Sequence, residues 1–100
     1  MEIKKTTDGN DVTIELKGRL DTITSSQLEE ELHGVLDNEG VNLTFDFSAL
    51  DYISSSGLRV LLSAQKKINA MGTKMKITGA NEVVKEIFEA TGFMKIMDLS

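Results

Sequence analysis

Residues 54–57, Ser-Ser-Ser-Gly, are the part of this chain best suited to chemistry. They stand between an alternating apolar run that ends at Phe47 and a helical apolar pattern that starts at Leu58. We therefore expect hydroxyl groups at the first turn of a helix. That turn leaves backbone N–H groups unpaired and carries partial positive charge, so a phosphate attached there would be held favourably. The pattern indicates a site where phosphorylation could act as a switch without unfolding the chain.

Composition is typical of one compact domain over residues 1–100. The chain is 40% hydrophobic and 27% charged, and a chain of 100 residues has room for only one core. The absence of cysteine excludes disulfides and thiolate metal sites, and we expect no metal and no cofactor. The apolar runs are too short for a membrane span and the N-terminus lacks the features of a secretory signal, so a cytoplasmic location is expected. A net charge of -5 argues against direct binding of nucleic acid.

The N-terminal residues predict a β-hairpin. Apolar and polar residues alternate from Val12 to Leu16, which is the period of a strand. Residues 8–10, Asp-Gly-Asn, give a turn signal after a short strand around Ile3. The two strands are therefore expected to pair antiparallel.

A first helix is expected to begin at Thr24. Thr24 and Gln27 have the spacing of a capping box, and Ile23 and Leu28 stand where a hydrophobic staple would form. Apolar residues keep helical spacing as far as residues 38–40, Asn-Glu-Gly, where the glycine can end the helix.

Strands and helices alternate in the rest of the chain. The expected elements are a central strand at 41–47, a helix capped by Ser54 with an Ile53–Leu58 staple and closed by Gly72, a strand at 74–78, and a helix capped by Asn81 and closed by Gly92. The apolar tail at 93–99 is expected to pack on the sheet or on a helix. This order predicts an α/β fold, with a mixed sheet of about four to five strands, three to four helices and an N-terminal antiparallel hairpin. The serines are then expected at the carboxyl edge of the sheet, where open α/β sheets usually bind partners.

Several segments occur in a fixed order that resembles one family. They are Gly-Arg-Leu-Asp at 18–21, Phe-Asp-Phe-Ser at 45–48, the run from Asp51 to Leu62, Val-Lys-Glu-Ile-Phe at 84–88 and Gly-Phe-Met-Lys-Ile at 92–96. Together they resemble the bacterial anti-sigma factor antagonists, which are stand-alone STAS domains. The resemblance covers nearly the whole chain and implies a STAS-like fold.

The resemblance implies a binding protein that works by partner switching. Members of that family capture an anti-sigma factor, itself a serine kinase, and so free a sigma factor. The kinase phosphorylates the antagonist, which then lets go, and a PP2C-type phosphatase restores the binding form. The modified serine lies two residues before the glycine of an Asp-Ser-Ser/Thr-Gly motif, which is Ser55 here, with Ser56 and Ser54 as lesser candidates. The chain departs from that motif at Ser54, where many members carry aspartate.

The resemblance also implies a partner-facing surface around the serines. The residues expected to bind the partner are Asp21, Thr22, Ser54, Ser56, Gly57 and Arg59. For Asp21 a role as a turn carboxylate stays open, and for Arg59 a role as a solvated helix residue. Asp46 is expected to make local hydrogen bonds at a strand end.

Two other functions are less well supported. A serine hydrolase needs a glycine two residues before its nucleophile, where this chain has Ile53, and it needs an imidazole base. The only histidine, His33, falls in the first expected helix and is assigned no function, so we expect no enzymatic activity and no catalytic residue. The closer alternative keeps the fold: a constitutive STAS adaptor subunit of a larger signalling or lipid-transport assembly.

Overall fold

A computed structural model describes residues 1–37, 40–92 and 98–99. The elements are β1 (Glu2–Asp8), β2 (Asp11–Leu20), α1 (Thr22–Leu36), β3 (Asn42–Ile53), α2 (Ser55–Met71), β4 (Met75–Thr78), α3 (Glu82–Thr91) and β5 (Asp98–Leu99). The strands form one five-stranded sheet in the order β1-β2-β3-β4-β5. β1 pairs antiparallel with β2, and each later pair is parallel. The predicted mixed sheet with an N-terminal hairpin and a central third strand is confirmed.

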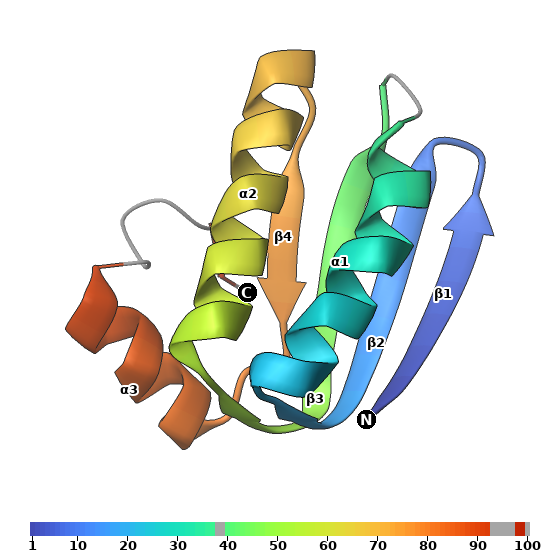
Figure 1. Ribbon diagram of the computed structural model, residues 1–100. Helices are drawn as coiled ribbons and strands as arrows, with labels where there is room; N and C mark the ends of the chain where they lie inside the picture. Colours follow the sequence, from blue (N-terminus) through green and yellow to red (C-terminus); the bar gives the residue numbers. More distant parts are fainter. Residues whose placement is uncertain (38–39, 93–97, 100) are drawn as a thin grey trace.

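The described helices all cover one face of this sheet. Because the strand order follows the chain order, right-handed crossovers bring every connecting helix to the same side. Figure 1 shows α1 and α2 side by side in front of the sheet, with α3 next to the start of α2. The ring of Phe88 in α3 lies 6.4 Å from the ring of Phe47 in β3, which fixes α3 on that same face.

The hydrophobic core lies between the helices and the sheet. Its fully buried members include Ile14, Leu16, Phe45 and Phe47 from the strands and Leu28, Leu61, Ile68 and Phe88 from the helices. Burying one such side chain stabilises the fold by about 1.5–3 kcal/mol. The alternation and the helical spacing read from the sequence therefore mark the buried faces of these elements. No described helix is both long enough and apolar enough to cross a bilayer.

β3 continues well beyond the predicted end at Phe47. Its register against β2 shifts between Glu15 and Lys17 and again between Gly18 and Arg19, with an additional residue on β3 each time. Each bulge changes the phase of the alternation. The prediction stopped at Phe47 for this reason, and β3 in fact reaches Ile53.

α1 begins at Thr22 and is capped by Asp21, so the prediction of a cap at Thr24 is wrong. The Asp21 carboxylate accepts hydrogen bonds from the backbone N–H groups of Ile23 at 3.0 Å and Thr24 at 2.9 Å. The Thr24 hydroxyl in turn accepts the Asp21 N–H at 2.8 Å, which completes a capping box three residues earlier than predicted. Ile23 is then in the first turn and 82% exposed, so the expected staple with Leu28 does not form.

The other helix ends follow the predictions except one. α1 ends at Leu36 with Asp37 as its C-cap, before the glycine at position 40 that was expected to end it. Asn81 caps α3 and accepts the N–H of Val84 at 2.8 Å. Gly72 and Gly92 end α2 and α3 in the left-handed conformation, at φ 74° and 78°.

The apolar tail at 93–99 was expected to pack on the sheet or on a helix. Its residues 93–97 lie outside the described part of the chain. Residues 98–99 form β5, whose backbone pairs with Lys76 and Ile77 of β4. This adds the fifth strand to the sheet.

Candidate functional site

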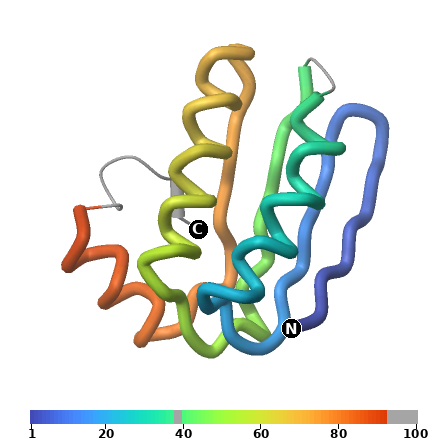
Figure 2. The backbone as a smooth tube through the Cα atoms, viewed as in Figure 1, coloured from blue at the N-terminus to red at the C-terminus, as the bar shows by residue number. Residues whose placement is uncertain are grey.

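The ends of β2 and β3 bring two helix starts together. Leu20 and Ile53 are paired across the two strands, and the next residue of each strand is a helix cap, Asp21 for α1 and Ser54 for α2. The backbone N–H of Ser54 also donates to the carbonyl of Leu20 at 2.8 Å. The first turns of α1 and α2 therefore lie at the same edge of the sheet, at the bottom of the trace in Figure 2.

The three serines occupy three different positions at the start of α2. Ser54 is the N-cap, and its hydroxyl accepts the Gly57 N–H at 3.2 Å. Ser55 is the first helical residue and is exposed, whereas Ser56 is half-buried. The first turn of α2 contains no acidic residue and its cap is neutral. The partial positive charge of this helix end is therefore not offset by a carboxylate of α2 itself.

Gly57 sets how closely the two helix starts approach each other. It is buried, and a Cβ at this position would lie 2.8 Å from both Cγ and Cδ2 of Leu20 and 3.2 Å from the Leu20 carbonyl oxygen. Non-bonded carbon atoms do not approach this closely, so a Cβ at position 57 would force neighbouring atoms to move. Only glycine lets the first turn of α2 lie this close to the end of β2.

Asp21 is held as a carboxylate. The backbone hydrogen bond from Thr24 is the main cause that lowers the pKa of Asp21 below its usual value, with further contributions from the Thr24 hydroxyl, the Ile23 N–H and the charge of Arg19. Its role in the turn, which the sequence left open, is thus observed. Both backbone bonds use Oδ1, and within the described part of the chain Oδ2 has no partner. That oxygen is available to a binding protein.

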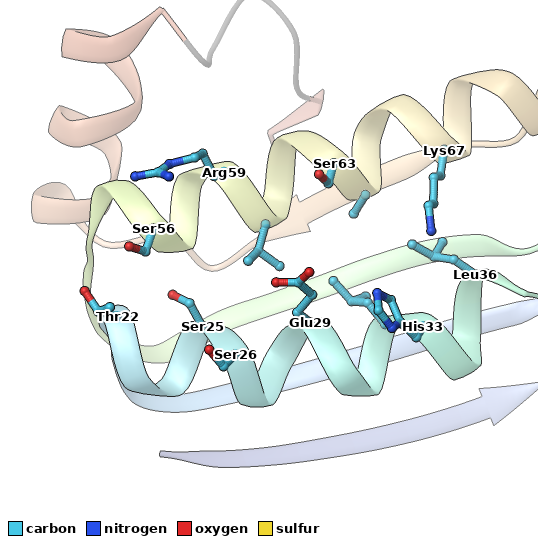
Figure 3. Close-up of a pocket in the computed structure, with 13 residues that line it drawn as sticks. Thr22, Ser25, Ser26, Glu29, His33, Leu36, Ser56, Arg59, Ser63 and Lys67 are labelled. Carbon is cyan, nitrogen blue, oxygen red and sulfur yellow. The ribbon is translucent and has the colours of Figure 1, made fainter.

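A groove of about 430 Å³ runs between α1 and α2 (Figure 3). Thr22, Glu29 and His33 line it from α1, and Ser56, Arg59 and Lys67 from α2. Three of the expected partner residues, Thr22, Ser56 and Arg59, thus lie at one end of this groove. The exposed Ser55 precedes Ser56 at the same end of α2.

Two residues considered in the sequence lie away from this edge. His33 is in the last turn of α1, eleven residues after Thr22, which is about 16 Å along a helix. It therefore forms no nucleophile–base pair with Ser55. Asp46 lies inside β3 rather than at a strand end. Its carboxylate accepts hydrogen bonds from the hydroxyl and the backbone N–H of Ser48, and the hydroxyl is the main cause that lowers the pKa of Asp46. The local hydrogen bonds expected of Asp46 are confirmed.

Ile23, which was expected in a hydrophobic staple with Leu28, is instead an exposed surface residue. It and Val83 are the exposed large hydrophobic side chains of the described chain, at 82% and 49% exposure. Ile23 follows Asp21 and Thr22 directly, so it lies beside the expected partner surface. An Asp-x-x-Thr spacing at 21–24 is itself a capping signal, and reading it would have placed Ile23 outside the core.

No group of three or more possible metal-ligating side chains occurs among the residues that the structure describes. The sheet edge at the starts of α1 and α2 carries several hydroxyl groups, the Oδ2 atom of Asp21 and the Arg59 side chain. Such a surface is suited to binding another protein.

Comparison with known proteins identifies the family. The STAS domain family matches residues 2–100. BtrV of Bordetella bronchiseptica, a candidate anti-sigma factor antagonist, is 33% identical over 85 residues, which are 85% of this chain and 73% of that protein. The anti-sigma-B factor antagonist of Listeria monocytogenes is 27% identical over 99 residues, covering 99% of this chain and 86% of that protein.

Solved structures show the same fold. Unphosphorylated SpoIIAA, an anti-sigma factor antagonist, superposes with a TM-score of 0.86 at 19% identity, over 99% of this chain and 88% of that one. The phosphorylated form of SpoIIAA from Bacillus gives a TM-score of 0.79 at 18% identity, over 99% and 91% of the two chains. From the family match over residues 2–100 and the relative at 33% identity, this chain belongs to the STAS domain family.

Proposed function

We propose that this chain is an anti-sigma factor antagonist, acting as one domain in the bacterial cytoplasm and switched off by phosphorylation of Ser55. In this role it binds an anti-sigma factor serine kinase through the edge formed by the starts of α1 and α2, and so releases a sigma factor. The family and the names of the curated relatives support the antagonist role. The observation that carries the switch is the exposed hydroxyl at the first position of α2.

Ser55 fits the modification better than its neighbours do. The Ser54 hydroxyl already accepts a hydrogen bond as the cap of α2, and Ser56 is half-buried beside the groove. The side chain of Ser55 is exposed, and its position leaves room for a kinase to reach Oγ. In the transfer, Oγ bonds to the γ-phosphorus of ATP, the hydroxyl proton passes to a base of the kinase, and ADP leaves.

The fold of this chain is expected to accept the phosphate with little change. A phosphoserine adds roughly -1.5 to -2 charges and three acceptor oxygens. At the start of α2 those oxygens meet backbone N–H groups that have no partner in the helix, next to a turn without acidic side chains. A PP2C-type phosphatase would return the hydroxyl by hydrolysis.

The docked partner would not accept the same phosphate. A protein packed over the bare Ser55 hydroxyl would face added volume and an anion that must be desolvated. A loss of about 3–4 kcal/mol at the interface weakens binding several hundred-fold. The surface that we assign to the partner comprises Asp21, Thr22, Ser54, Ser56, Gly57 and Arg59.

Phosphorylation by candidate kinases tests this proposal. The chain is incubated with ATP and each serine-kinase anti-sigma factor of its genome, followed by intact-mass measurement and peptide mapping. One phosphate on Ser55 is expected, lost in Ser55→Ala and kept in Ser56→Ala and in Ser63→Ala, which alters an exposed serine further along α2. Phosphate at another residue contradicts the assignment of Ser55. Stable assembly with partners but no phosphorylation by any kinase would favour the constitutive adaptor instead.

A further inference from the structure

Arg59 lies one helical turn after Ser55. Both side chains are exposed and belong to α2, at positions i and i+4. Side chains with this spacing are neighbours on a helix surface, and an acidic group placed four residues before a basic one is the favourable order. A negative charge gained at Ser55 would therefore lie within reach of the Arg59 guanidinium.

The Arg59 guanidinium is available for such a contact. Over residues 1–37, 40–92 and 98–99 it makes no ion pair and no hydrogen bond. Figure 3 shows the side chain on the α2 wall of the groove, extending toward the N-terminal end of the helix above Ser56. In a chain with a net charge of -5, this leaves an unpaired cation extending toward the end of α2 at which Ser55 is the first residue.

Other charged groups face this region from neighbouring elements. Arg19 lies near the end of β2, Asp21 caps the start of α1, and Glu29 faces the groove from α1. His33 and Lys67 are in the same groove but toward its other end, as Figure 3 shows. Arg59 is thus the basic residue of α2 nearest to Ser55.

We propose that Arg59 is the intramolecular counter-charge of a phosphate on Ser55. The inference rests on the proposed function, since it needs that phosphate. The planar guanidinium can donate two parallel N–H groups to two phosphate oxygens, while the third oxygen accepts from a free backbone N–H of the first turn. Phosphorylation then does two things: it adds an anion to the partner surface, and it removes from that surface a cation that the unmodified chain offers to a partner's carboxylate.

A phosphate titration tests this role independently of any kinase. Phosphoserine is incorporated at position 55 during translation, and the second ionisation of the phosphate is followed by phosphorus NMR in the parent and in Arg59→Ala. Because a nearby cation favours the doubly charged phosphate, its pKa is expected to be higher in Arg59→Ala by about 0.5 or more, roughly a threefold gain in proton affinity. Arg59→Lys, which keeps the charge but not the planar donor pair, is expected to fall in between.

Lys67→Ala is the matched control, because it removes a cation of the same helix and groove at a greater distance from Ser55. Its titration is expected to follow that of the parent, and thermal unfolding checks that each variant folds. An Arg59→Ala curve that coincides with the parent curve overturns the proposal, as does an equal shift in Lys67→Ala. Because the phosphate is built in, a failure of kinases to modify the natural chain would count against the proposed function and not against this result.

Discussion

Gly57 lies directly against Leu20, so close that a methyl group at position 57 would be 2.8 Å from two carbons of the leucine side chain. The contact joins the first turn of α2 to the end of β2. Because Asp21 follows Leu20, the same contact fixes the start of α1 relative to the serines. The proposed partner surface is therefore assembled before any partner arrives.

Replacing Gly57 by alanine is expected to destabilise the chain. The added methyl group must displace Leu20, which is fully buried, and such overpacking costs about 1–3 kcal/mol. The free energy of unfolding in urea measures the loss. Gly34→Ala is the control: this glycine is also helical, a Cβ there meets nothing within 4 Å, and a gain of about 0.5–1 kcal/mol is expected. Equal stability of Gly57→Ala and the parent would refute the close contact.

Ser54→Ala is expected to weaken the start of α2. The variant loses the hydroxyl that accepts the Gly57 N–H, and loss of an N-cap costs about 0.5–2 kcal/mol. Ser54→Asp keeps an acceptor and adds a favourable negative charge of about 0.3–1 kcal/mol at the helix end. Urea unfolding should rank Ser54→Asp above the parent and the parent above Ser54→Ala. A stable Ser54→Ala would mean that the hydroxyl does not cap the helix.

The cap of α1 gives stability a specific dependence on pH. The pKa of Asp21 is lower in the folded chain than in the unfolded chain. The carboxylate therefore contributes fully to the free energy of unfolding above the unfolded pKa of about 4, and this contribution is lost as the pH falls through the folded pKa. Asp21→Asn keeps a side-chain acceptor but cannot titrate. We expect the melting temperature of the parent to fall more steeply than that of Asp21→Asn as the pH drops below about 4. Parallel curves for the two proteins would show that Asp21 does not contribute in this way.

Ile23 is expected to contribute to partner binding. An isoleucine that is 82% exposed beside Asp21 and Thr22 can be buried by a docked protein, so Ile23→Ala should weaken binding of the anti-sigma factor about tenfold with little change in stability. Val83→Ala is a matched control, because Val83 holds the same second position in α3 that Ile23 holds in α1. Isothermal titration compares the variants. Equal affinities for the two would place Ile23 outside the interface.

Much of the fold could be predicted because its signals are local. Ser54 and Asn81 cap helices, Gly72 and Gly92 end them, and each of these four roles depends on residues only a few positions away. Alternation also marked the buried side of the strands. It failed in β3 after Phe47, since the bulges that shift its phase exist only in the pairing with β2.

The site was only partly predictable because its geometry depends on contacts between distant segments. The sequence shows three serines before a glycine, but it does not show that Gly57 packs on Leu20 or that Leu20 pairs with Ile53. The cap at Thr24 was wrong because two capping patterns overlap at 21–27, and only the structure shows that Asp21 accepts the N–H groups. Because Asp21 is the cap, Ile23 falls in the first turn of α1, where it is exposed.

The most direct test of the account compares anti-sigma factor binding by the parent, Ser55→Ala and Ser55→Asp, with thermal unfolding measured on the same samples. We predict that Ser55→Ala binds about as well as the parent, that Ser55→Asp binds several hundred-fold more weakly, and that all three unfold at nearly the same temperature. Tight binding by Ser55→Asp would contradict the claim that an anion at the start of α2 releases the partner.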